Sequence, residues 1–148
     1  MSISSHEQKF EVLQHLTAII SDTSNAESER FRAKRALARI GDERAARLLE
    51  ETAERCTDKT VLSDIVEILG ELSPSEASIV ALIKLVWHET PQIRRGAIKA
   101  LGRRGDRRAA RLLEQVIAES TDIQSIFEEE DARLAEEARK RIEARLED

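Results

Sequence analysis

Residues 41–50 read GDERAARLLE, and residues 105–114 read GDRRAARLLE. The two segments lie 64 residues apart, and half of that distance leads to a third turn followed by an apolar stretch, at residues 73–77. Three copies of one unit then align in columns: Leu37, Leu69 and Leu101; Ala45, Ala77 and Ala109; Leu48, Val80 and Leu112; and the small residues Ala38, Gly70 and Gly102. Self-similarity at a fixed spacing of this size indicates a repeat architecture.

Each copy has the pattern of two helices joined by a short turn. Gly41 and Gly105 are expected to take the left-handed conformation that ends a helix, and Asp42 and Asp106 to cap the helix that follows. The spacing predicts first helices at about 25–40, 61–72 and 91–104, and second helices at 43–56, 74–88 and 106–119. Two more helices are predicted at the ends, over 6–20 and 132–147.

The strings ALARIGD at residues 36–42 and ALGRRGD at residues 100–106 carry a family resemblance. Each is followed by an alanine (Ala45, Ala109) and then a leucine (Leu49, Leu113), and over about residues 24–119 the chain resembles the HEAT repeats. The similarity is to the short bacterial form first named from phycobilisome lyase subunits, although the middle copy lacks Gly-Asp. The resemblance implies an all-α fold, an α-α superhelix of about seven helices that forms a HEAT-like solenoid.

The repeats predict a single domain over residues 1–148. It would comprise a partial N-terminal unit (1–22), repeats at about 24–58, 59–89 and 90–121, and a C-terminal capping helix (132–147). Terminal units of such arrays cover the core on one side and face water on the other.

Composition limits the possible functions. The 148 residues carry a net charge of −5, one cysteine (Cys56) and no apolar run that could span a membrane, so we expect a cytoplasmic protein without a membrane partner. The three histidines (His6, His15 and His88) are not spaced to share a metal ion. We therefore predict no catalytic residue, no cofactor and no metal, and a chain that is not an enzyme.

Positive charge is concentrated between residues 91 and 111, which contain eight Arg or Lys and one acid. One interpretation is a strip that binds a nucleic-acid backbone, formed by Arg94, Arg95, Lys99, Arg103, Arg104, Arg107 and Arg108. The favoured interpretation is a set of ion pairs between neighbouring repeats, since Arg32, Arg35 and Arg39 align with Asp64, Glu67 and Glu71. We therefore do not expect nucleic acid as a partner.

The second helix of the middle copy is unusually apolar. Ile79 and Ile83 occupy columns that are polar in both flanking copies, and Val86 aligns with Glu54 of the first copy. Leu82 and Trp87 border this stripe. We expect this stripe to bind a protein partner through the inner face of the solenoid; the alternative is that the helix is more deeply buried. The predicted partner-binding residues are Arg44, Arg47, Ile79, Leu82, Ile83, Val86, Trp87, Arg108 and Arg111.

The function predicted from these features is a protein-binding scaffold or assembly adaptor. The partner could be a different protein or a second copy in a homodimer, which the sequence does not distinguish. A further alternative, an accessory subunit of a tetrapyrrole or phycobilisome system, comes from the family resemblance alone.

Overall fold

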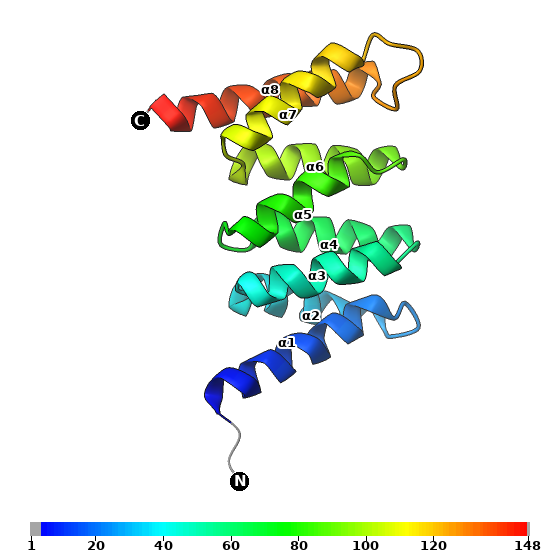
Figure 1. Ribbon diagram of the computed structural model, residues 1–148. Coiled ribbons are helices and arrows are strands. Elements are labelled where there is room, and N and C mark those ends of the chain that lie inside the picture. The colour runs from blue at the N-terminus through cyan, green and yellow to red at the C-terminus, as the bar shows by residue number, and fades with distance from the viewer. Residues whose placement is uncertain (1–3, 148) are drawn as a thin grey trace. The chain divides into compact units, whose positions relative to one another are not determined.

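A computed structural model describes residues 4–147. Within that range the chain forms eight α-helices and no strand (Figure 1), which confirms the all-α class. The eight helices match the eight ranges predicted from the spacing, one more than the number of about seven that the resemblance implies. The helices are α1 (Ser5–Ser21), α2 (Glu27–Ile40), α3 (Glu43–Arg55), α4 (Lys59–Glu71), α5 (Glu76–Val86), α6 (Pro91–Arg104), α7 (Arg107–Glu119) and α8 (Glu129–Glu147).

The predicted aspartate caps are confirmed. The Asp42 carboxylate accepts the amide N–H groups of Arg44 and Ala45 at 3.0 and 3.3 Å, and Asp106 does the same at the start of α7. These amides have no partner inside the helix, so each cap stabilises its helix by about 0.5–2 kcal/mol.

The predicted left-handed glycines are wrong. Gly41 and Gly105 are extended, with φ of −66° and −74°. The position requires glycine because there is no room for a side chain. A Cβ on Gly105 would lie 2.6 Å from the Leu101 carbonyl oxygen, 2.7 Å from Ala109 Cβ and 3.0 Å from Ile142 Cδ1. The Gly-Asp-x-x-Ala motif therefore combines a tightly packed turn with a capped helix start.

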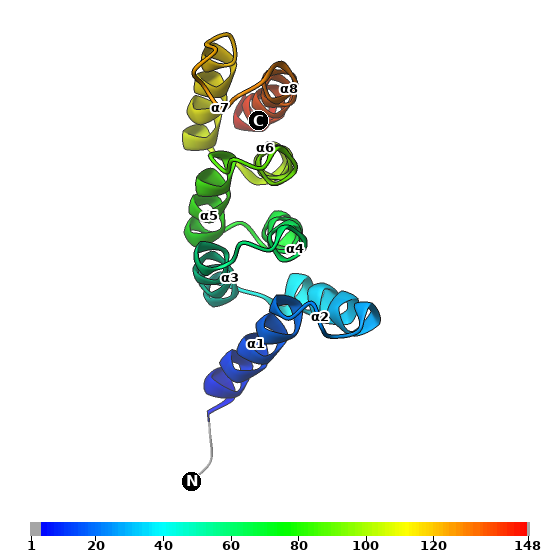
Figure 2. The same ribbon diagram turned by 90° about the vertical axis from the view of Figure 1, so that its right-hand side faces the viewer.

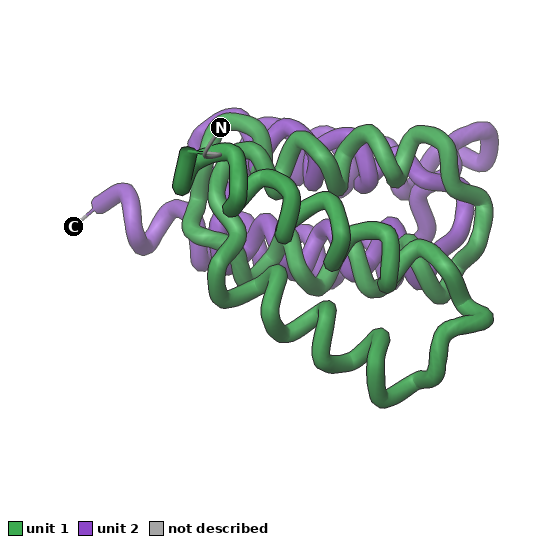
Figure 3. Tube along the Cα trace, turned by 90° about the horizontal axis from the view of Figure 1, so that it is seen from below, with its two compact units in different colours: residues 1–78 green, residues 79–148 purple. Residues whose placement is uncertain are grey.

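The chain divides into two compact units, residues 1–78 and 79–148 (Figure 3), and the boundary falls within α5. In unit 1, α1 packs against α2, α3 and α4, and α4 also contacts α2 and α3. Its core is aliphatic and nearly inaccessible to water, and includes Leu13, Ile20, Leu37, Leu49, Ile65 and Leu69.

Ion pairs join α2 to α4 in unit 1 through two of the predicted acids, Asp64 and Glu67, but not through the predicted arginines. Arg30 pairs with Asp64 at 2.9 Å, and Lys34 pairs with Asp64 at 3.4 Å and with Glu67 at 2.8 Å. Arg32, Arg35 and Arg39 are exposed and form no ion pair with any residue between 4 and 147. The predicted register is wrong because Ala33 and Leu37 are the residues that α2 buries, which places positions 30 and 34 beside them.

In unit 2, α8 packs against both α6 and α7 (Figure 2). A Cβ on Gly102 would lie 2.9 Å from Ala138 Cβ and 3.0 Å from its Cα, which confirms that the small-residue column marks a close helix approach at this position. Arg145 of α8 donates to the carbonyl oxygens of Gly102 and Gly105 at 2.6 and 3.0 Å. These carbonyls lie at the end of α6, where a cation is favoured by the helix dipole.

Candidate functional site

Trp87 follows the last residue of α5 and is only partly covered. Its side chain is 43% exposed, and its ring packs on Phe127 with centroids 5.1 Å apart and planes tilted by 53°. Phe127 itself is 2% exposed. A tilted aromatic pair of this kind contributes about 0.5–1.5 kcal/mol beyond the area that it buries. Trp87 is therefore held against a side chain that is itself buried.

Two further apolar side chains project from the loop between α7 and α8. Ile123 is 99% exposed and Ile126 is 42% exposed, although each belongs to a residue type that is usually buried. This loop and the α5–α6 connection lie at the same end of unit 2 (Figure 1). We call Trp87, Ile123, Ile126 and Phe127 the loop-end surface.

A buried ion pair fixes both loops. Arg94 is 1% exposed and Asp131 is not exposed; their Nη2 and Oδ2 atoms lie 2.8 Å apart, and Arg94 Nε donates to the same oxygen at 2.9 Å. Arg94 Nη1 also donates to the carbonyl oxygens of His88 and Glu89, both at 3.2 Å. One side chain therefore joins the connection after Trp87 to the start of α8.

The Asp131 carboxylate accepts hydrogen bonds at both of its oxygens. Besides Arg94 it accepts from Arg95 Nε at 2.9 Å and from the Glu128 amide at 2.7 Å, while the Glu128 side chain pairs with both arginines. Burial raises the pKa of the Asp131 carboxyl, but these hydrogen bonds and the Arg94 charge outweigh it, so the pKa lies below its ordinary value.

This pKa shift predicts a dependence of stability on pH. Because the folded-state pKa of Asp131 is depressed below its ordinary 3.8, its contribution is present above about pH 4 and is lost as the pH falls through the folded value. In urea denaturation, the stability difference between the wild type and Asp131→Asn is expected to be largest at neutral pH and to shrink on acidification below about pH 4. A difference that is constant across this range would contradict the prediction.

The apolar stripe predicted on the middle helix is largely buried. Ile79 is 8% exposed, Leu82 and Val86 are not exposed, and Ile83 is half-buried. The expectation that Ile79 and Val86 face water is therefore wrong, and the alternative of local burial describes them. Trp87, placed at the border of the stripe, is its exposed member.

The predicted arginines have different surroundings. In unit 1, Arg44 is half-buried over the Phe10 ring and donates to the His6 carbonyl oxygen, and Arg47 is exposed and pairs with Glu43. In unit 2, Arg108 pairs with Asp106, and Arg111 is exposed.

Two residues of the predicted basic strip are engaged in ion pairs within unit 2. Arg94 is buried, and Arg95 pairs with Asp131 and Glu128. The interpretation in which both arginines contact phosphates is therefore wrong, because their charges are neutralised within unit 2.

Residues 4–147 contain no group of three or more His, Cys, Asp or Glu side chains placed to hold a metal ion. Over the same range, no helix is both long enough and apolar enough to cross a membrane. The predicted cytoplasmic location stays a prediction.

Comparison with known proteins places this chain among helical repeats. A family model of HEAT repeats matches residues 53–126, half of the chain. The structure of human deoxyhypusine hydroxylase in complex with glycerol is similar, with a TM-score of 0.77 and 20% identity over 96% of this chain and 47% of the hydroxylase. This chain thus spans about half of the hydroxylase chain. No curated protein is similar enough to match. The predicted resemblance and superhelical fold class are confirmed.

The prediction that this chain is not an enzyme is contradicted by that structural similarity, because the similar protein is a hydroxylase. At 20% identity the similarity shows the fold alone. The prediction relied on the composition, the single cysteine and the spacing of the histidines, and the same fold can carry different functions.

Proposed function

This chain belongs to the HEAT repeat family, and we propose that it is a protein-binding domain that holds its partner at the loop-end surface of unit 2. The observation that supports this most strongly is Trp87, which is 43% exposed and packs its ring on the buried Phe127. The buried Arg94 holds the carbonyl groups of His88 and Glu89, which follow Trp87 directly. Tryptophan is among the residues that contribute most to protein interfaces. An anchor that is already ordered loses little conformational entropy on binding.

The position of the exposed apolar residues supports this proposal. Single exposed apolar side chains are ordinary on protein surfaces. Three large ones, Trp87, Ile123 and Ile126, occur in the two loops at one end of unit 2. Their grouping is typical of an interaction surface.

The charge of the loop indicates the chemistry of the partner. Residues 120–131 contain five acids and no basic residue. Arg94 and Arg95 neutralise Asp131 and Glu128, but Asp122 and Glu129 remain exposed and form no ion pair with residues 4–147. A complementary partner presents apolar side chains flanked by Lys or Arg, because opposite potentials raise the association rate and exclude acidic competitors.

The proposal predicts that Ile123→Asp weakens partner binding at least about tenfold, since it replaces an apolar contact with a negative charge. The tagged full chain would capture proteins from an extract of its source organism, treated with nuclease, and the retained partner would then be purified and titrated. Trp87→Ala is expected to weaken binding about thirtyfold.

Val12→Asp is the matched control, because Val12 of α1 is also exposed, at 46%, and receives the same change. It is expected to leave the affinity within about twofold. Ile123→Asp should also leave the urea midpoint unchanged, because Ile123 is almost fully exposed. A partner that binds all these variants with wild-type affinity would show that the loop-end surface is not the site.

A further inference from the structure

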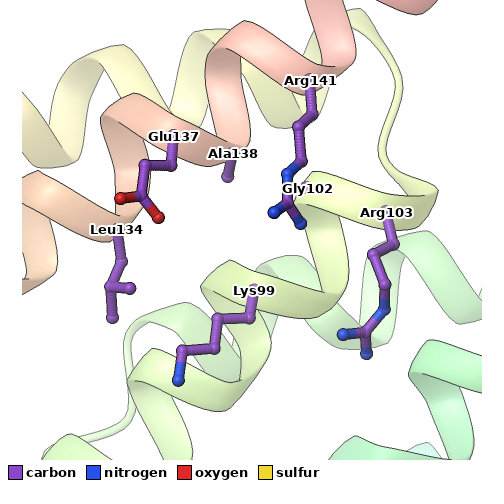
Figure 4. Close-up of a pocket in the computed structure, with 7 residues that line it drawn as sticks. All are labelled: Lys99, Gly102, Arg103, Leu134, Glu137, Ala138 and Arg141. Carbon is purple, nitrogen blue, oxygen red and sulfur yellow. The ribbon is translucent and has the colours of Figure 1, made fainter.

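A groove between α6 and α8 collects unpaired positive charge in unit 2. It has a volume of about 150 Å³ and is lined by Lys99, Gly102, Arg103, Leu134, Glu137, Ala138 and Arg141. Figure 4 shows Lys99 and Arg103 projecting from α6, and Arg141 extending from α8 toward it. The close approach of Gly102 to Ala138 forms the floor.

The three cations differ from four other arginines of α6 and α8, which form ion pairs. Arg133 and Arg139 of α8 each pair with two glutamates, and Arg94 and Arg95 of α6 pair with Asp131. By contrast, Lys99, Arg103 and Arg141 are exposed and form no ion pair with any residue from 4 to 147. The only acid of the lining, Glu137, pairs with Arg133 at 3.1 Å. The groove therefore carries a net positive charge that the described chain does not neutralise.

The shape of the groove favours carboxylates on a helix. Lys99 and Arg103 are four residues apart, one turn of α6, so their attachment points repeat about every 6 Å along the axis. Glutamates at positions i and i+4 of a partner helix repeat at the same distance. Leu134 and Ala138 supply apolar surface between the cations, where the small residues of such a helix can pack.

Nucleic acid fits this groove less well. None of the seven lining residues is aromatic, so no base could stack there.

We propose that the α6–α8 groove is a binding site for an acidic helical segment of a protein, with Lys99, Arg103 and Arg141 contacting its carboxylates. This site shares no residue with the loop-end surface and does not depend on the function proposed there. The carboxylates would pair with guanidinium groups whose planar donors suit bidentate contacts.

The test uses a fluorescently labelled helical peptide of alanine and glutamate, with glutamates four positions apart, titrated with the full chain by fluorescence anisotropy. The wild type is expected to bind it, and Arg103→Glu combined with Arg141→Glu to weaken binding at least about tenfold. Raising the salt concentration should weaken wild-type binding, because both partners are exposed charges. The same peptide with glutamine in place of glutamate should not bind.

Arg107→Glu combined with Arg111→Glu is the matched control, since both residues are exposed on α7 and the net charge changes equally. It should bind the peptide within about twofold of the wild type, as should Ile123→Asp. Equal losses of affinity in the two double variants would show that the effect comes from net charge and not from the groove. Absence of wild-type binding would refute the site. Tighter, groove-dependent binding of a single-stranded oligonucleotide would likewise overturn the proposal in favour of nucleic acid.

Discussion

Asp131→Ala is expected to lower the free energy of unfolding by about 3–5 kcal/mol, the range found when one partner of a buried ion pair is removed. The guanidinium of Arg94 is 1% exposed and would lose its buried counter-ion, and the Glu128 amide would lose its acceptor. Urea denaturation followed by circular dichroism at neutral pH measures the loss. Because Trp87 is the only tryptophan, its fluorescence reports on the same region. Its emission is expected to shift to the red as the loops loosen and water reaches the ring.

Arg133→Ala provides the comparison. Its ion pairs with Glu130 and Glu137 are exposed, so its removal should give no measurable loss of stability. Asp131→Asn gives a side chain of similar size that keeps one hydrogen-bond-accepting oxygen, so it should lower the free energy of unfolding less than alanine does. If Asp131→Ala lowers the free energy of unfolding no more than Arg133→Ala does, the ion pair does not hold the two loops in place. Trp87 would then lack the ordered surroundings that the proposed function requires.

The helices could be predicted because their signals are local and repeated. Asp42 and Asp106 accept amide hydrogen bonds within two or three residues of themselves, and the aliphatic columns recur at helical spacing. Capping and periodicity require no knowledge of distant contacts. Every predicted helix range therefore corresponds to a helix in the structure.

The surface predictions failed where they depended on distant contacts. Arg94 lies in a strongly basic stretch, and only the fold brings Asp131, 37 residues later, against it. A signal was present, because an acidic segment, residues 128–131, follows the basic helix within the same half of the chain. Charge of opposite sign in two segments indicates a possible pair, but helix packing decides which residues meet.

The middle-helix stripe failed for a different reason. The comparison of columns assumed that all three copies expose the same face. Leu82 and Val86 are nevertheless unexposed, and Ile79 is 8% exposed. A helix with apolar residues around most of its circumference is typically buried, so the loss of polar residues from α5 indicated burial. Trp87 lies beyond the last turn of α5, which explains how it remains exposed.

The second large effect is expected at the contact between α6 and α8, where Gly102→Val should destabilise the protein by about 3 kcal/mol, the upper end of the range for overpacking. Ala138 Cα is only 3.0 Å from where the new Cβ would lie, and a backbone atom cannot rotate away as a side chain can. Valine is a better helix former than glycine, which opposes this loss by only a fraction of a kcal/mol. Urea denaturation measures the net change.

A double-mutant cycle tests the cause. Ala138→Gly removes the Cβ that lies 2.9 Å from the new one and should cost about 1 kcal/mol alone, as should Ala144→Gly at an exposed position of α8. In the Gly102→Val background, Ala138→Gly is expected to recover about 1 kcal/mol instead, a coupling that contacting residues show and distant ones do not. Ala144→Gly should remain additive there. If both glycine substitutions are additive, the close approach of α6 and α8 does not limit the residue at position 102, and the small-residue column needs another explanation.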